Sequence, residues 1–174
     1  MNVEELVRLA QNGDDEAFYE LVSRDKEKLY RIALAYLKNE ADALEAIQEM
    51  TYRAYSKLKK LKEPKYFNTW LIRILINYCI DEQKRKKRVL PLMHAESAAD
   101  GNEIDHRKFG LELAIERLEP KYKHIIMLKY FHDLTITEIA QVLECPDGTV
   151  KSWLNKALKG LREFVGKEGE GGHV

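Results

Sequence analysis

The sequence lacks the features that mark several large classes of protein. Its 2 cysteines, Cys79 and Cys145, have neither the number for a disulfide framework nor the spacing of metal ligands, and we expect Cys79 to be a buried thiol. No apolar run approaches the ~20 residues that cross a bilayer, and the early acids of the N-terminus are unlike a signal peptide. Strand-like alternation and internal repeats are also missing. We therefore expect an all-α protein that is not inserted in a membrane and is located in the cytoplasm.

The sequence also has no net charge, although charged residues are abundant. Its 29 Lys+Arg and 29 Asp+Glu balance to a formal net charge of +0, and charged residues make up 33% of the chain. For nucleic-acid binding, the distribution of charge matters more than the sum. Lysines gather at 57–65, a Lys-Arg run follows at 84–88, and acids concentrate near the N-terminus and at 96–119. Such separated surfaces would allow DNA to bind on one side and a different partner on the other.

Apolar residues at helical spacing recur through the first 88 residues. The pattern predicts a helix at 3–11 and a second helix that begins after a cap at Asp14 or Asp15. Three more helices are predicted at 28–37, 41–58 and 66–88. The helix at 41–58 is expected to bury Leu44, Ile47, Thr51, Ala54, Tyr55 and Leu58. Its opposite side carries a polar face that periodicity alone assigns to solvent, made of Asp42, Glu45, Gln48 and Glu49. The helix at 66–88 is expected to bury Phe67, Trp70, Leu71, Ile74, Leu75 and Tyr78.

A lysine-rich loop at 57–65 joins these last two helices. Lysines can follow phosphates while aromatic rings stack on unpaired bases, so this combination suits single-stranded nucleic acid. Tyr66 and Asn68, at the junction of loop and helix, are the candidates for base contact. Phe67 and Trp70 fall on the apolar stripe, and we expect them in the core instead.

The composition changes at 89–106, where Pro, Gly, Ser and several acids interrupt the helical pattern. This segment predicts a flexible acidic linker between two small helical domains. Beyond the linker the pattern predicts a helix at 109–118, a helix starting at Pro120, and an apolar face over 125–131. The Gly-rich tail after Phe164 is expected to fray.

Residues 134–164 have the pattern of a helix-turn-helix. Thr135 and Glu138 form a capping box before a first helix, and residues 144–148 break the pattern before a second helix. The second helix exposes a polar, basic face, made of Lys151, Ser152, Asn155, Lys156, Lys159 and Arg162. In DNA-binding proteins with this motif the second helix lies in the major groove. The alternative is an ordinary αα-hairpin whose lysines only face solvent.

Three motifs, in this order and split by the linker, resemble those of the extracytoplasmic-function (ECF) sigma factors of bacteria. Residues 41–49 resemble the family's signature for docking on core RNA polymerase. Residues 67–71, followed by Asn77, Asp81 and the basic run, resemble its segment for promoter melting and −10 recognition. Residues 136–140 and 148–152 resemble its −35-reading helix-turn-helix. The sequence is similar, more narrowly, to the SigV-like members of Bacillus-type bacteria.

The resemblance covers all but the tail of the chain, and it implies roles for individual residues. It divides the chain into sigma region 2 at 1–88, a linker at 89–107, sigma region 4 at 108–165 and a flexible tail at 166–174. Docking on the β and β′ subunits of core RNA polymerase is implied for Asp42, Glu45, Gln48 and Glu49. Contact with the single non-template strand of the −10 element is implied for Lys60, Lys62, Tyr66, Asn68, Asn77, Lys84, Arg85 and Arg88. Contact with the −35 duplex is implied for Thr149, Lys151, Ser152, Asn155 and Lys156.

The function implied is that of an alternative sigma factor, which directs promoter recognition, DNA opening and transcription initiation in an extracytoplasmic stress response. The resemblance implies no enzyme activity, no cofactor and no metal, and it implies a cognate anti-sigma factor that can be membrane-anchored. Trp153 departs from the family, which often has Arg there, so it is left out of the DNA contacts.

Two other functions are considered. A stand-alone helix-turn-helix regulator of duplex DNA would leave residues 41–49 and the lysine loop without a role. A metal-dependent nuclease would have to use Asp81 and Glu82, adjacent acids that point to different sides of a helix.

Overall fold

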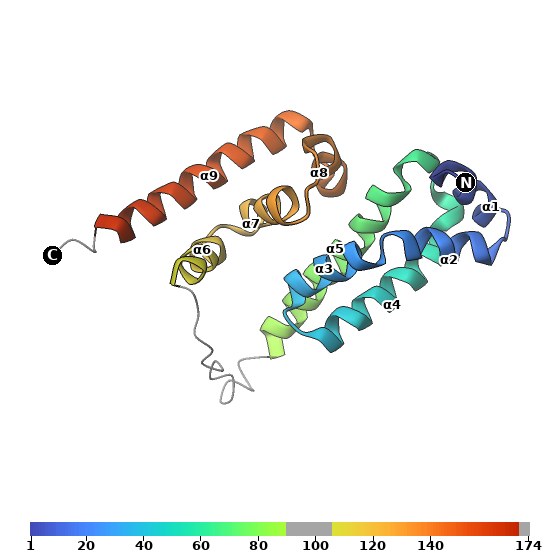
Figure 1. Ribbon diagram of the computed structural model, residues 1–174, viewed down its shortest axis with the longest axis horizontal. Coiled ribbons are helices and arrows are strands. Elements are labelled where there is room, and N and C mark those ends of the chain that lie inside the picture. The colour runs from blue at the N-terminus through green and yellow to red at the C-terminus, as the bar shows by residue number, and fades with distance from the viewer. Residues whose placement is uncertain (90–105, 171–174) are drawn as a thin grey trace. The chain divides into compact units, whose positions relative to one another are not determined.

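The computed structural model describes residues 1–89 and 106–170, and the chain divides into two compact units that meet in sequence between Glu96 and Ser97 (Figure 1). The described residues form helices and turns without a strand, which confirms the all-α prediction. Residues 90–105, nearly all of the predicted linker, lie outside the described residues. The finer domain boundaries at 88/89 and 107/108 stay predictions.

In the first unit, the described residues 1–89 form five helices and two short 3₁₀ turns. In chain order these are α1 (Val3–Gln11), α2 (Asp15–Arg24), α3 (Lys26–Leu37), α4 (Glu40–Lys57), η1 (Leu58–Lys60), η2 (Pro64–Tyr66) and α5 (Phe67–Val89). Helices α3, α4 and α5 pack on one another, and α1 packs on α2 and on both 3₁₀ turns. The lysine-rich loop of the sequence is therefore the η1–η2 segment, and α1 packs against it.

Short polar side chains start α1, α2 and α4. Asn2 and Glu5 form a capping box at α1, and the Asp14 side chain accepts a hydrogen bond from the Ala17 amide at 3.0 Å. Asn39 does the same for the Asp42 amide at 2.9 Å. Each such cap contributes about 1 kcal/mol to helix stability. Of the two aspartates considered for the start of α2, Asp14 is the cap.

The buried face of α4 differs from the prediction. The helix buries Ala43, Ala46, Met50 and Ala54, whereas Leu44 is 55% exposed and Tyr55 is 53% exposed. Alanine side chains are small and allow α4 to pack closely on α3 and α5. The prediction placed larger apolar side chains in the core and so missed Ala43 and Ala46. Ala54 and Leu58 are buried as predicted, but the assignment of Leu44 and Tyr55 to the core was wrong.

The buried face of α5 is also rotated from the predicted one. Phe67, Leu71, Leu75 and Cys79 are fully buried, together with Ile72 and Ile76, which the prediction missed. Trp70, Ile74 and Tyr78 are only half-buried. Helix α5 contacts α1, α3 and α4, so it needs a wide apolar face rather than one stripe. Burial raises the pKa of the Cys79 thiol to about 12, which confirms a structural thiol.

The second unit consists of α6 (His106–Glu116), α7 (Pro120–Ile126), a π-helical turn η4 (Met127–Phe131), α8 (Ile136–Leu143) and α9 (Asp147–Glu170). Its core joins Ile115, Ile126 and Ala157, with partly buried Leu118, Tyr122, Leu154, Leu158 and Leu161 around them. Two predictions were wrong here. Phe131 is 58% exposed rather than part of an apolar face, and α9 continues past Phe164 to Glu170, so residues 166–170 are helical rather than a frayed tail.

Candidate functional site

Hydrogen bonds hold both ends of α8 and link it to the start of α9. Thr135 accepts from the Glu138 amide at 3.1 Å, and Glu138 accepts from the Thr135 amide at 2.9 Å, which confirms the predicted capping box. Glu144 ends α8 in the left-handed region at φ 55°, where the Cys145 amide donates to the Ala140 carbonyl at 3.0 Å. The Thr137 hydroxyl then donates to Asp147 at 3.0 Å and so links the first turn of α8 to the first residue of α9. These bonds define the angle at which α9 leaves the turn.

The exposed face of α9 is the one that the sequence predicts. Lys151, Ser152, Asn155 and Lys156 are all exposed, and Thr149 is half-buried. On the other side, Val150 and Ala157 are fully buried. Residues three and four apart share a face of a helix, so Ser152, Asn155 and Lys156 lie together near the N-terminal end of α9.

Trp153 belongs to the inner side of this helix. It is half-buried, and the Lys121 ammonium of α7 lies 5.4 Å from the centre of its ring. This packing against α7 removes Trp153 from the exposed face, in agreement with its omission from the predicted contacts.

The η1–η2 segment presents its charges to solvent. Lys59, Lys60 and Lys62 are exposed, and Tyr66 is 40% exposed with the Lys65 ammonium 4.9 Å from the centre of its ring. Asn68 follows, also exposed, while Phe67 is fully buried as expected. Trp70 packs beside Phe67, with the ring centres 5.8 Å apart. The loop and the start of α5 therefore combine cations, an amide and an accessible aromatic ring.

The predicted −10 residues of α5 fall on two different sides of the helix. At about 100° per residue, Asn68 and Asn77 are about 180° apart around the axis, whereas Asn77, Lys84 and Arg88 share one line. All four are exposed. The structure thus groups Asn68 with the loop, and it groups Asn77 with the cationic end of α5.

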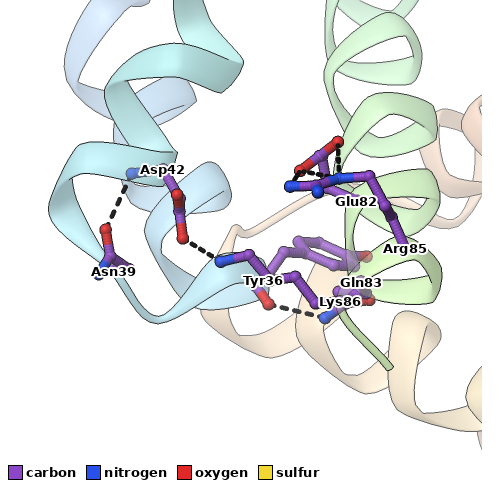
Figure 2. Close-up of polar contacts among 7 residues, drawn as sticks. All are labelled: Tyr36, Asn39, Asp42, Glu82, Gln83, Arg85 and Lys86. Atoms are coloured by element: carbon purple, nitrogen blue, oxygen red, sulfur yellow. Dashed lines mark hydrogen bonds and ion pairs between the residues drawn. The ribbon is translucent and has the colours of Figure 1, made fainter. Parts of the chain in front are cut away.

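The acidic face of α4 meets α5 through an ion pair that the sequence did not reveal. Lys86 donates to the Asp42 carboxylate, as Figure 2 shows. Arg85 pairs with Glu82 at 3.0 Å, and the Gln83 amide donates to the Tyr36 carbonyl at 2.7 Å. Asp42 and Arg85, both predicted contact residues, therefore already have partners within the chain. Surface pairs of this kind are worth about 0–1 kcal/mol, so a stronger partner can displace them.

The remainder of this face is more accessible. Glu45 and Gln48 are exposed, and Glu49 accepts from Arg53 at 3.1 Å. The Arg53 guanidinium also lies 5.3 Å from the centre of the Tyr78 ring. Burial, and then the negative charges of Glu82, Glu45 and Glu49, raise the pKa of Tyr78.

Within residues 1–89 and 106–170, no group of three or more His, Cys, Asp or Glu side chains could hold a metal ion. In the same part of the chain, no helix is long and apolar enough to cross a membrane. Asp81 and Glu82, the pair considered for a nuclease, have no third acidic, His or Cys side chain gathered with them there.

Comparison with known proteins identifies the family. The models of sigma-70 region 2 and sigma-70 region 4 match residues 21–89 and 109–161. The chain is 34% identical to RNA polymerase sigma factor SigV of Bacillus subtilis over 149 residues, which cover 84% of this chain and 90% of that protein. It is 31% identical to ECF RNA polymerase sigma factor SigW of the same organism over 180 residues, covering 94% and 96%. The chain is an ECF sigma factor.

Two solved structures share the fold. CnrH, solved in complex with the cytosolic domain of CnrY, gives a TM-score of 0.71 at 22% identity and covers 95% of this chain and 97% of its own. RpoE of Bartonella quintana, solved with the anti-sigma factor NepR, gives a TM-score of 0.63 at 20% identity and covers 85% and 96%. As an ECF sigma factor, the protein acts in promoter recognition and transcription initiation.

Proposed function

We propose that this ECF sigma factor docks on the β and β′ subunits of core RNA polymerase through the polar face of α4, reads the −35 duplex with α9, and captures the single −10 strand with the η1–η2 loop and α5. In this division of labour, sigma region 2 is residues 1–88 and sigma region 4 is residues 108–165. The protein supplies binding energy and no catalytic group.

The observation that carries the proposal is the polar face at the start of α9. It lies on the second helix of a helix-turn-helix whose angle is held by the Thr137–Asp147 bond. Lys151, Ser152 and Asn155 stand exposed on its first turns, where helices of this motif meet base edges in the major groove. Thr149 and the helix N-terminus add a phosphate site beside them.

The opening of DNA is assigned to the first unit. Lys60, Lys62 and the accessible ring of Tyr66 suit the capture of an unpaired base, and Asn68 lies beside them at the start of α5. Asn77, Lys84, Arg85 and Arg88 then provide amide and cationic groups along α5 for the strand or the adjacent duplex. Capture of extruded bases offsets part of the stacking energy that opening requires, so no ATP site is needed.

The docking surface is assigned to Glu45, Gln48 and Glu49, with Asp42 at its edge. Asp42 makes a poor test residue because its reversal would also release Lys86. Glu45→Lys combined with Gln48→Lys changes exposed positions only. Glu16→Lys, on the exposed surface of α2, is the matched control.

The experiment is co-elution of each variant with core RNA polymerase that lacks any sigma factor, followed by transcription from a promoter that the wild-type holoenzyme selects from a random duplex library. We expect the wild type and Glu16→Lys to co-elute with core RNA polymerase and to initiate transcription. The Glu45→Lys, Gln48→Lys double variant should not co-elute with the core enzyme. Duplex DNA binding by the chain alone, without any complex with core enzyme, would instead identify a stand-alone regulator.

Regulation by a cognate anti-sigma factor is part of the proposal. CnrH was solved in complex with the cytosolic domain of CnrY, and RpoE in complex with the anti-sigma factor NepR. Such a partner could hold this protein inactive in the cytoplasm, at the membrane if the partner is anchored there, until an extracytoplasmic stress releases it.

A further inference from the structure

The last residue of α1 makes two hydrogen bonds to the lysine-rich loop. The Gln11 side-chain amide donates from Nε2 to the Leu58 carbonyl at 3.0 Å and to the Leu61 carbonyl at 2.9 Å. These partners are 47 and 50 residues away in the sequence. An amide nitrogen has two donor protons, and this geometry uses both of them on one turn of the loop.

The two bonded carbonyls bracket the residues that the loop presents to solvent. Leu58 is only 3% exposed and anchors the loop in the core, and its carbonyl also accepts from the Leu61 amide at 3.1 Å. Between these anchors lie Lys59 and Lys60, both exposed, and Lys62 follows directly. Gln11 therefore holds the backbone from which the lysines project.

The next turn of the loop has backbone restraints of its own. Pro64 starts η2, and the Tyr66 amide donates to the Glu63 carbonyl at 3.0 Å before α5 begins. Helix α1 contacts this turn as well as η1. Residues 61–63, between the two 3₁₀ turns, are thus held at one end by the Gln11 bond to Leu61 and at the other by the turn that carries Tyr66.

We propose that Gln11 is a positioning residue for DNA capture, because it holds the η1 turn closed and fixes Lys60 and Lys62 relative to Tyr66 before DNA arrives. Fixing a backbone residue in one conformation costs conformational entropy. With Gln11 in place, this ordering occurs on folding rather than on DNA binding, and affinity for the unpaired strand rises. The inference rests on the proposed function of the loop.

The test compares two methionine variants. Gln11→Met keeps an unbranched side chain of similar length but has no donor. Gln83→Met is the matched control, because the Gln83 amide also bonds a backbone carbonyl 47 residues away, that of Tyr36, but has no bond to the loop. Both variants are compared with the wild type for thermal stability and for binding to core RNA polymerase.

Two readouts then separate positioning from general stability. The first is trypsin cleavage after Lys59, Lys60 and Lys62 in the free protein, which should become faster only in Gln11→Met. The second is the affinity of each holoenzyme for a single-stranded −10 oligonucleotide. We expect Gln11→Met to bind it about tenfold more weakly, because the loop must then be ordered on DNA binding rather than on folding. This difference should disappear when the captured base is replaced by an abasic site, found by scanning each −10 position.

The outcomes are distinct. Equal −10 affinity and equal trypsin cleavage in the wild type and Gln11→Met would overturn the positioning role alone. If Gln11→Met and Gln83→Met lost −10 affinity equally and in proportion to their fall in melting temperature, Gln11 would contribute only to the stability of the fold. Failure of the wild type to bind core enzyme would overturn the proposed function itself, and the DNA role of Gln11 with it.

Discussion

Asn155 allows a test in which stability and promoter recognition should change in opposite directions. The side chain is exposed on α9, which begins at Asp147. At a rise of 1.5 Å per residue, Asn155 is about 12 Å along the helix from its start. The major groove is about 12 Å wide, so Asn155 lies within the part of α9 that a groove can accept.

The two expected effects of Asn155→Ala have different physical causes. Alanine has the higher helix propensity, so the variant should be as stable as the wild type, or more stable by roughly half a kcal/mol. Loss of a true base contact should weaken −35 binding by about 1–3 kcal/mol, which is about 5- to 150-fold. A fall in promoter affinity without a fall in stability can come only from the interface.

Arg162→Ala is the matched control on the same helix. Seven residues separate the two positions, so they share one side of α9, and Arg162 is exposed as well. However, Arg162 lies about 22 Å from the helix start and therefore beyond the width of the groove. Its removal should leave the −35 sequence preference unchanged.

The assay is competition between −35 variants for the holoenzyme, at fixed salt and with the selected −10 element kept constant. Asn155→Ala should relax the preference at one or two −35 positions. Lys156→Ala should weaken all sequences alike and reduce the salt dependence, with a slope smaller by about 0.9. An unchanged preference in Asn155→Ala, or the same relaxation in Arg162→Ala, would show that α9 does not read the −35 element through this face.

Three further predictions concern stability. Gly13 has φ 101°, and Gly13→Ala should lower the stability of the first unit by about 1–2 kcal/mol because a Cβ is strained in this region. Met50 is fully buried in α4, so Met50→Ala should lower the free energy of unfolding of the first unit by about 2–5 kcal/mol, measured by denaturant unfolding. Burial, and then the positive charge of Lys123, lower the pKa of His124 below its ordinary 6.5. Protons therefore bind the unfolded chain more readily, and the second unit should lose stability as pH falls below about 6.5. His124→Gln should flatten this decline in thermal melts.

Each of these predictions has a control. Gly148→Ala changes a glycine that also has open space around it but no positive φ, so it should not destabilise the second unit. Leu44→Ala removes a side chain that is 55% exposed and should change stability by less than about half a kcal/mol. A large loss in Leu44→Ala, with a small one in Met50→Ala, would mean that the buried face of α4 is the one that the hydrophobic pattern predicts. If the wild type and His124→Gln lost stability equally as pH falls, the loss would come from titratable groups other than His124.

Elements whose sequence signal is local were predicted well. The capping box at Thr135, the cap of α2 at one of two candidate aspartates and the start of α7 at Pro120 each depend on contacts within one turn of helix. The exposed residues of α9 were also found from spacing, because one helix face with polar side chains is visible in the sequence alone. In the first unit the failures occur in α4 and α5, the two helices that pack against several neighbours at once. There the buried face depends on how closely those neighbours approach.

The sequence by itself determined the helices, the helix-turn-helix and membership of the ECF sigma factors, since each follows from residues close together in the chain or from motifs in a fixed order. Only the tertiary structure decided which residues meet across long separations. Lys86 reaches Asp42 across 44 residues, and Gln11 reaches the lysine-rich loop across 47 and 50. No periodicity encodes these contacts, because a helix pattern specifies which side chains share a face but not which neighbour that face meets.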